Sequence, residues 1–141
     1  MKNADTDNVM RAVAHILAVT VLLDRRQKDQ EMIEFCHSVM TINQRLRPGV
    51  ILPRKTILSW YEAEREKIAI ALANDTDDTF KTQALEKIRD PELRRSVLAS
   101  IFAICICDYE FQDEEAAFIK IALNIWKSGM PSLDEMTLIA G

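Results

Sequence analysis

The stretch VLASIFAICICDYEFQDEEAAFI, residues 97–119, decides how this chain folds, because an uncharged apolar run passes within a few residues into a dense acidic one. An apolar run of roughly 10–14 residues is more typical of a buried helix than of a membrane span, which needs about 20. Asp90 followed by Pro91 provides a helix start, with an N-cap acceptor and a proline at the first helical position. The sequence therefore predicts a helix over residues 91–107, apolar nearly all round in its second half and central in the fold.

The acidic half of the stretch predicts a second helix. Gln112 or Asp113 can cap it. The carboxylates of Glu114 and Glu115 fall in its first turn with that of Asp113, where the helix dipole favours negative charge. Asp108 lies in the corner between the two helices and faces the negative end of the first helix dipole, so it needs loop N–H groups or a cation as its partner.

The same arrangement occurs near the N-terminus. The segment HILAVTVLLDRRQKDQEMIEF, residues 15–35, aligns without a gap with ASIFAICICDYEFQDEEAAFI, residues 99–119. The alignment pairs Asp24 with Asp108, Asp29 with Asp113, Glu31 with Glu115, and Phe35 with Ile119. Helical hairpins that do not bury their apolar faces alone tend to pack together, so we expect an internal pseudo-repeat of two helical hairpins.

This repeated pattern resembles that of the TerB-like tellurite-resistance proteins, in which an apolar helix ending in Ala-Asp-Gly, a short corner and a Glu-Glu helix start occur twice in one all-helical domain. The two copies here read LLDRRQKDQE, residues 22–31, and ICDYEFQDEE, residues 106–115. Both keep the Asp and the distal Glu, whereas Arg25 and Tyr109 stand where the family has glycine. The resemblance covers most of the chain, and it implies a single TerB-like domain over residues 1–141 with a non-enzymatic role in stress or metal response.

Composition places the chain among ordinary globular proteins. It has 141 residues, of which 48% are hydrophobic and 28% are charged, which is enough for one domain with a sizeable core. A net charge of −4 argues against a nucleic-acid binder, which is more often basic, and leaves cations and basic partners open. Residues 1–8 are polar and lack the features of a secretory signal.

The cysteines point to a reducing compartment. Cys36, Cys105 and Cys107 all fall inside predicted helices, and their number is odd. Cys105 and Cys107 lie about 200° apart around a helix, so neither a disulfide framework nor a zinc site is indicated. We therefore expect reduced thiols in the core and a cytoplasmic protein.

Helical periodicity and helix breakers divide the rest of the chain into further helices. The expected ranges are a first helix capped at residues 5–7 and ending near residue 23, a second from residue 28 or 29 to about residue 45, then 54–73, 79–89, and a last helix from Pro131. The predicted fold class is therefore all-α, a compact bundle of about six or seven helices.

Several other residues that could belong to a functional site are better explained as ordinary structural residues. His15 and His37 lie on different predicted helices without a His-Glu-x-x-His spacing, which favours ordinary histidines over metal ligands. The basic group Arg45, Arg47 and Arg54 lacks a glycine-rich turn, which favours a solvated loop over a phosphate site. No phosphate loop, nucleophile elbow or Cys/His pair supports an enzyme, so we predict neither catalytic nor cofactor-binding residues.

Two hypotheses of function remain open. In the first, which the resemblance implies, the corners bind a divalent cation, and hard oxygen ligands suit Ca²⁺, Mg²⁺ or Mn²⁺. The predicted metal ligands are Asp24, Glu31, Asp108 and Glu115, with Asp29, Asp113 and Glu114 nearby. In the second, the carboxylates only start helices, and the protein is an interaction module whose acidic corners or exposed helix faces dock a protein partner. Membrane association is expected only through such a partner, and the oligomeric state is not predicted.

Overall fold

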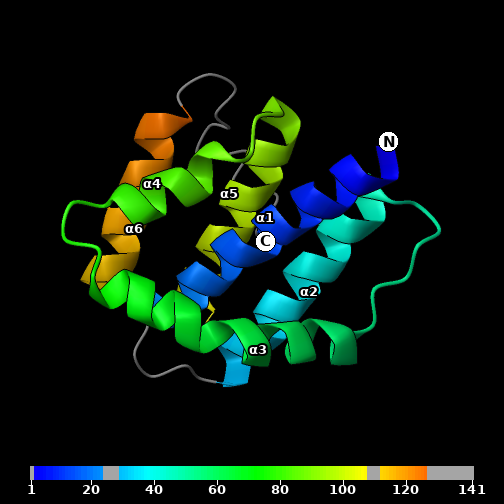
Figure 1. The fold of residues 1–141 in the computed structure, drawn as a ribbon, viewed down its shortest axis with the longest axis horizontal. Coiled ribbons are helices and arrows are strands. Elements are labelled where there is room, and N and C mark those ends of the chain that lie inside the picture. Colours follow the sequence, from blue (N-terminus) through cyan, green and yellow to red (C-terminus); the bar gives the residue numbers. More distant parts are fainter. Residues whose placement is uncertain (1, 24–28, 108–111, 127–141) are drawn as a thin grey trace.

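Six α-helices and no strand make up the part of the chain that this computed structural model describes, residues 2–23, 29–107 and 112–126 (Figure 1). The helices are α1 (Lys2–Leu23), α2 (Asp29–Leu46), α3 (Arg54–Ala73), α4 (Thr79–Glu86), α5 (Pro91–Ile106) and α6 (Asp113–Ile125). The predicted all-α fold class is confirmed, and the six described helices correspond to the six that were expected before Pro131. The helix predicted from Pro131 lies outside the described residues.

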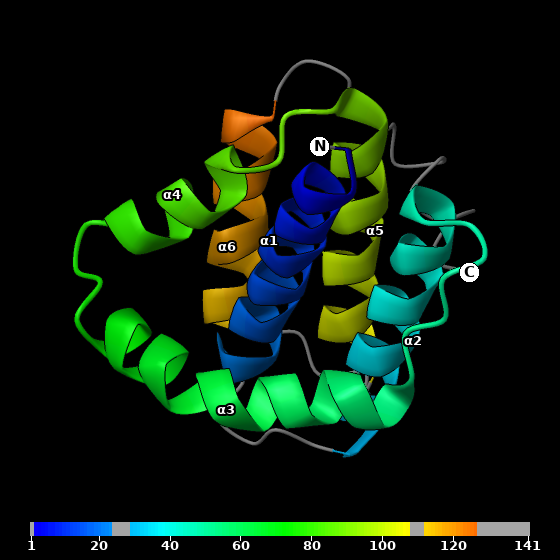
Figure 2. The same ribbon diagram turned by 45° about the vertical axis from the view of Figure 1, so that its right-hand side comes forward.

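The first helix, α1, lies at the centre of the fold and packs against each of the other five helices. Figure 2 shows it standing between α6 on one side and α5 and α2 on the other. Its buried side chains are Met10, Ala12, Val13, Ala14, Ile16, Leu17, Ala18, Val19, Thr20 and Val21. A helix that is covered on all sides must be apolar on all sides, and residues 12–23 of α1 carry no Asp, Glu, Lys or Arg.

The prediction that helix 91–107 is the central one was wrong. Helix α5 has nearly the predicted bounds, but among the described helices it packs against α1, α2 and α6 and not against all five. Ile101 and Ile104 are fully buried, whereas Ile106 is 37% exposed. The physical reason is that one side of α5 stays open to solvent, where Glu92, Arg95 and Ile106 are exposed, whereas residues 12–21 of α1 are buried on all sides except at His15.

Four helices form two hairpins that share one end of the bundle. In Figures 1 and 2, α1 and α5 run in the same direction, and α2 and α6 run back in roughly the opposite direction. The last turns of α1 and α5 and the first turns of α2 and α6 therefore lie at the same end. The helix starts also agree with the sequence alignment, since α2 begins at Asp29 and α6 at Asp113, which is its aligned partner.

Local signals set several of the helix ends. The Asp90 carboxylate accepts a hydrogen bond from the Leu93 backbone N–H at 2.9 Å, as the Asp-Pro start predicts. Helix α1 begins at Lys2, before the predicted cap at residues 5–7, and Asp7 forms an ion pair with Arg47 instead of capping. Helix α4 ends at Glu86 and not at residue 89, because the N–H groups of residues 87 and 88 bond three residues back, which tightens the last turn.

Helix α4 is capped by the buried side chain of Asp75 and not by that of Asp78, the residue at the N-cap position. Asp78 occupies the N-cap position with a positive φ of 63°, and its side chain makes no capping bond. The Asp75 carboxylate, only 2% exposed, accepts instead from the backbone N–H groups of Phe80 at 3.0 Å and Lys81 at 3.3 Å. It also accepts from Lys81 Nζ at 3.2 Å. One carboxylate thus fixes the turn between α3 and α4.

Among the described helices, α1 is also long and apolar enough to cross a membrane by length and composition. Its segment Thr6–Leu23 has a mean hydropathy of 1.3, and 56% of that segment is buried inside the protein. The core helix of a globular protein can be equally long and apolar, so this property is weak evidence for a membrane span.

Candidate functional site

The two repeated glutamates occupy the same place in their helices. Glu31 is the third residue of α2 and Glu115 is the third residue of α6. Glu31 is 1% exposed and Glu115 is 0% exposed, whereas Asp29 and Asp113, two residues earlier, are exposed. Carboxylates are almost never fully buried unless they are hydrogen-bonded or paired. Positions that match in the sequence therefore also match in their environment.

Cys105 connects the two glutamates. Its thiol is buried in α5, hydrogen-bonds the side chain of Glu115 and lies within electrostatic range of Glu31. Burial raises the pKa of the Cys105 thiol strongly, and the negative charges of Glu115 and Glu31 raise it further, because a thiolate there would be both desolvated and repelled. Glu115 thus contacts this thiol directly, and the charge of Glu31 reaches it from the other hairpin, at the shared end of the bundle.

Tyr61 of α3 lies on the Glu31 side of this site. Its side chain is buried, and its ring packs against Phe35 with the ring centroids 5.4 Å apart. Burial raises the pKa of the Tyr61 hydroxyl, and the charge of Glu31 acts in the same direction. Sequence reasoning did not assign Tyr61 or Cys105 to a site. The residue aligned with Cys105 in the first copy is Val21, so the repeat carries no signal for a thiol here.

Glu115 also has a local role at the start of α6. Its Oε1 accepts a hydrogen bond from the Gln112 backbone N–H at 2.9 Å, which is the bond that a glutamate at the third helical position makes in a capping box. This bond agrees with the hypothesis in which the carboxylates start helices. It does not account for the complete burial of Glu115, because a solvent-exposed glutamate can make the same bond.

The other two predicted ligands, Asp24 and Asp108, lie outside the described residues. Within the three described ranges, no group of three or more His, Cys, Asp and Glu side chains is arranged to hold a metal ion. The described part of the chain therefore places Glu31 and Glu115 at the same end of the bundle, and the four-carboxylate site stays a prediction.

The three cysteines are not joined in disulfides, and Cys36 and Cys105 are buried as predicted. We expect Cys105 to be unreactive in the native protein, because its raised pKa suppresses the reactive thiolate. Titration with a chromogenic disulfide at about pH 8 should modify the half-buried Cys107 first, and all three thiols after unfolding. Fast native modification of Cys105, located by mass spectrometry, would contradict the proposed environment of the thiol.

The remaining candidates have structural roles. The His15 ring meets Phe80 edge to face at 5.5 Å, and burial, helped by the Lys87 charge, lowers the pKa of His15, while His37 is exposed. The basic group is more than the solvated loop that we expected. In the last turn of α2, Arg45 Nη1 donates to Ser96 Oγ of α5 at 2.8 Å, which joins these two helices. Just after α2, Arg47 Nε donates to Asn43 Oδ1 at 2.8 Å, and Arg47 pairs with Asp7 of α1.

Comparisons with protein-family models, with curated proteins and with solved structures find no match to this chain. The TerB-like resemblance stays a prediction that rests on the two repeated corners.

Proposed function

We propose that this protein is a non-enzymatic, TerB-like stress or metal-response protein that binds a divalent cation where its two acidic corners meet. The observation that carries the proposal is the equivalence of Glu31 and Glu115: they hold the same position in two aligned helices and are both buried, and Glu115 hydrogen-bonds the Cys105 thiol while Glu31 lies within electrostatic range of it. Asp24 and Asp108, in the two corners, are the ligands that we expect to complete the set.

Electrostatics favours a cation at this place. Ionised carboxylates are costly to bury, and two of them at the same end of a bundle repel each other, because the low dielectric of the interior strengthens the interaction. A divalent cation bound by both carboxylates replaces this repulsion by attraction. A bound cation would therefore offset the cost of burying the two carboxylates. Their negative charge is also the reason to expect a cation as the ligand.

The chemistry of the donors selects among metals. Carboxylate oxygens are hard ligands and suit Ca²⁺, Mg²⁺ or Mn²⁺. Cys105 adds a sulfur atom, but its thiol hydrogen-bonds the side chain of Glu115. Because the expected ligands are otherwise all oxygen atoms, we expect a hard cation.

Calorimetric titration with Ca²⁺, Mg²⁺ and Mn²⁺, together with thermal melts, tests the proposal. We expect a heat of binding and a rise in melting temperature for the wild type. Glu31→Gln, Glu115→Gln and Asp108→Asn should each weaken binding by about tenfold or more, because each removes a charged oxygen ligand while nearly keeping the shape of the side chain.

Glu114→Gln is the matched control. Glu114 lies in the same first turn as Glu115, carries the same charge and is exposed. Its replacement should leave the affinity for the cation almost unchanged. Equal weakening by Glu114→Gln and Glu115→Gln would indicate a diffuse negative field and no defined site. Absence of any heat or melting shift in the wild type would rule out the cation hypothesis.

The second candidate function is a protein interaction module without a metal site. It is favoured by the outer side of α2, where Ile33 is 53% exposed and Met40 is 37% exposed. The two residues are seven positions apart, so they lie on the same side of the helix, two turns from each other. A helix face of this kind suits the docking of a partner, and this function is the better account if the titration shows no effect of metal.

A further inference from the structure

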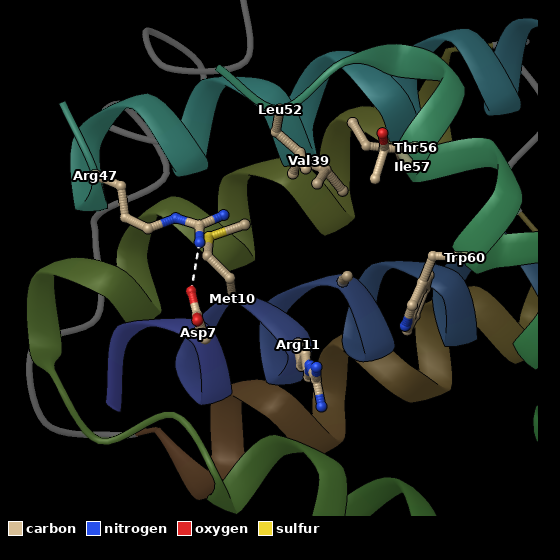
Figure 3. Close-up of a pocket in the computed structure, with 10 residues that line it drawn as sticks. Asp7, Met10, Arg11, Val39, Arg47, Leu52, Thr56, Ile57 and Trp60 are labelled. Atoms are coloured by element: carbon tan, nitrogen blue, oxygen red, sulfur yellow. Dashed lines mark hydrogen bonds and ion pairs between the residues drawn. The ribbon is translucent and has the colours of Figure 1, made fainter. Parts of the chain in front are cut away.

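A cavity separate from the acidic corners lies between the first half of α1 and the start of α3 (Figure 3). It has a volume of about 300 Å³. Its apolar walls come from Met10, Ala14, Val39, Leu52, Ile57 and Trp60. The ion pair between Asp7 and Arg47, the dashed line in Figure 3, closes one end. Ligand pockets are typically of this size or larger and are mostly apolar with a few polar groups.

A second and more polar cavity adjoins the first. It has a volume of about 670 Å³, and it shares Arg11 and Trp60 with the apolar cavity. Its other lining residues include His15, Glu64 and Lys87. An apolar chamber therefore meets a polar one along an edge formed by Arg11 and Trp60. In Figure 3 the Trp60 ring extends from α3 toward α1, which carries Arg11.

Two hydrogen-bond donors at this edge, and a third in the polar cavity beside it, have no bonded acceptor within the described part of the chain. The side chains of Arg11, Trp60 and Lys87 make no hydrogen bond or ion pair to any residue that the structure describes. Of the nearby acids, Asp7 pairs with Arg47, and Glu64, on the His15 side of the polar cavity, lies 3.7 Å from Lys67. A guanidinium and an indole N–H that face a cavity without a paired acceptor favour an anion, and the planar guanidinium matches a carboxylate.

We infer that the two cavities form one binding site for an amphipathic monocarboxylate, with its aliphatic chain in the apolar cavity and its carboxylate on Arg11 and the Trp60 N–H. The size of the apolar cavity sets the length of the chain. A volume of about 300 Å³ corresponds to about ten water-sized groups, so a chain of about six to ten carbons fits.

Octanoate is a suitable probe, and the two tryptophans provide the readout. Trp60 lines the cavity, whereas the Trp126 indole is buried and donates to the Leu85 carbonyl at 3.1 Å, so its N–H signal is an internal reference. In an NMR titration of the whole protein we expect octanoate to shift the Trp60 indole signal in a saturable manner and to leave that of Trp126 in place. Octanol should bind about tenfold more weakly or worse, and octylamine should not bind.

Three variants test the parts of the site. Arg11→Gln should weaken octanoate about tenfold or more and leave octanol unchanged, because it removes only the charge-assisted bond. Lys55→Gln removes an exposed cation from outside both cavities and should change neither affinity. Thr56→Trp places a large side chain in the cavity wall from an exposed position, so the protein should still fold and lose both ligands.

The inference is overturned if the Trp60 signal does not move at millimolar octanoate. It is also overturned if octanoate and octanol bind equally and Arg11→Gln has no effect, because the apolar cavity would then act without anion recognition. Unchanged octanoate binding in a folded Thr56→Trp protein would place the ligand elsewhere and contradict the inference as well.

Discussion

Replacing Leu17 by alanine should lower the free energy of unfolding by about 2–5 kcal/mol. Leu17 is fully buried in α1, the helix against which the other five pack, so the loss combines the transfer energy of the removed atoms with a cavity that the surroundings cannot fill. Ile101→Ala in α5 should fall in the same range, because Ile101 is fully buried too. Denaturant titration followed by circular dichroism measures both.

The control for this prediction is Ile70→Ala. Ile70 lies on α3 and is 56% exposed, so its replacement should change the stability by no more than about 0.5 kcal/mol. A loss below about 1 kcal/mol for Leu17→Ala, with a normal loss for Ile101→Ala, would mean that α1 does not have the central position described above.

Removing the Asp75 carboxylate should have the second largest effect. We expect Asp75→Ala to lower the free energy of unfolding by about 2–3 kcal/mol. The change leaves the backbone N–H groups of Phe80 and Lys81 without their acceptor at the start of α4, and it takes from Lys81 its buried counterion. Denaturant titration of the wild type and the variant gives this difference directly.

Two further variants separate the causes of this loss. Asp75→Asn keeps one acceptor oxygen and removes the charge, so it should cost less than Asp75→Ala. Asp77 lies in the same turn and accepts from the Thr79 N–H at 3.2 Å, but it is exposed, so Asp77→Ala should have a clearly smaller effect. Equal losses for the alanine variants at positions 75 and 77 would show that burial of Asp75 contributes nothing.

Helix positions could be predicted from the sequence because their causes are local. Helix α3 has the predicted bounds of residues 54–73, and α5 starts at Pro91, where Asp90 caps it. The choice of the central helix could not be predicted in the same way. The apolar runs of α1 and α5 each show that a helix is buried, but the number of helices that cover it depends on packing between segments far apart in the chain.

Only those residues of the candidate site that belong to the repeat could be predicted from the sequence. The alignment of Glu31 with Glu115 anticipated two equivalent carboxylates, and their helices do start at the same end of the bundle. The thiol of Cys105 was not foreseen, because nothing in the sequence tells which apolar position of α5 contacts Glu115. Asp75 is a similar case. It shares the segment DTDD with two other aspartates, and only the fold decides which carboxylate turns inward.

The burial of α1 has a consequence for the synthesis of the protein. This helix precedes the five helices that cover it, and α6 is completed about a hundred residues later. At about 5–20 residues per second, the ribosome needs about 5–20 s for that interval. During this time an apolar segment that is long and hydrophobic enough for a membrane span lacks part of the cover that it has in the folded protein. We therefore expect chaperones to bind the nascent chain. The helical bundle is completed only after α5 and α6 have left the ribosome.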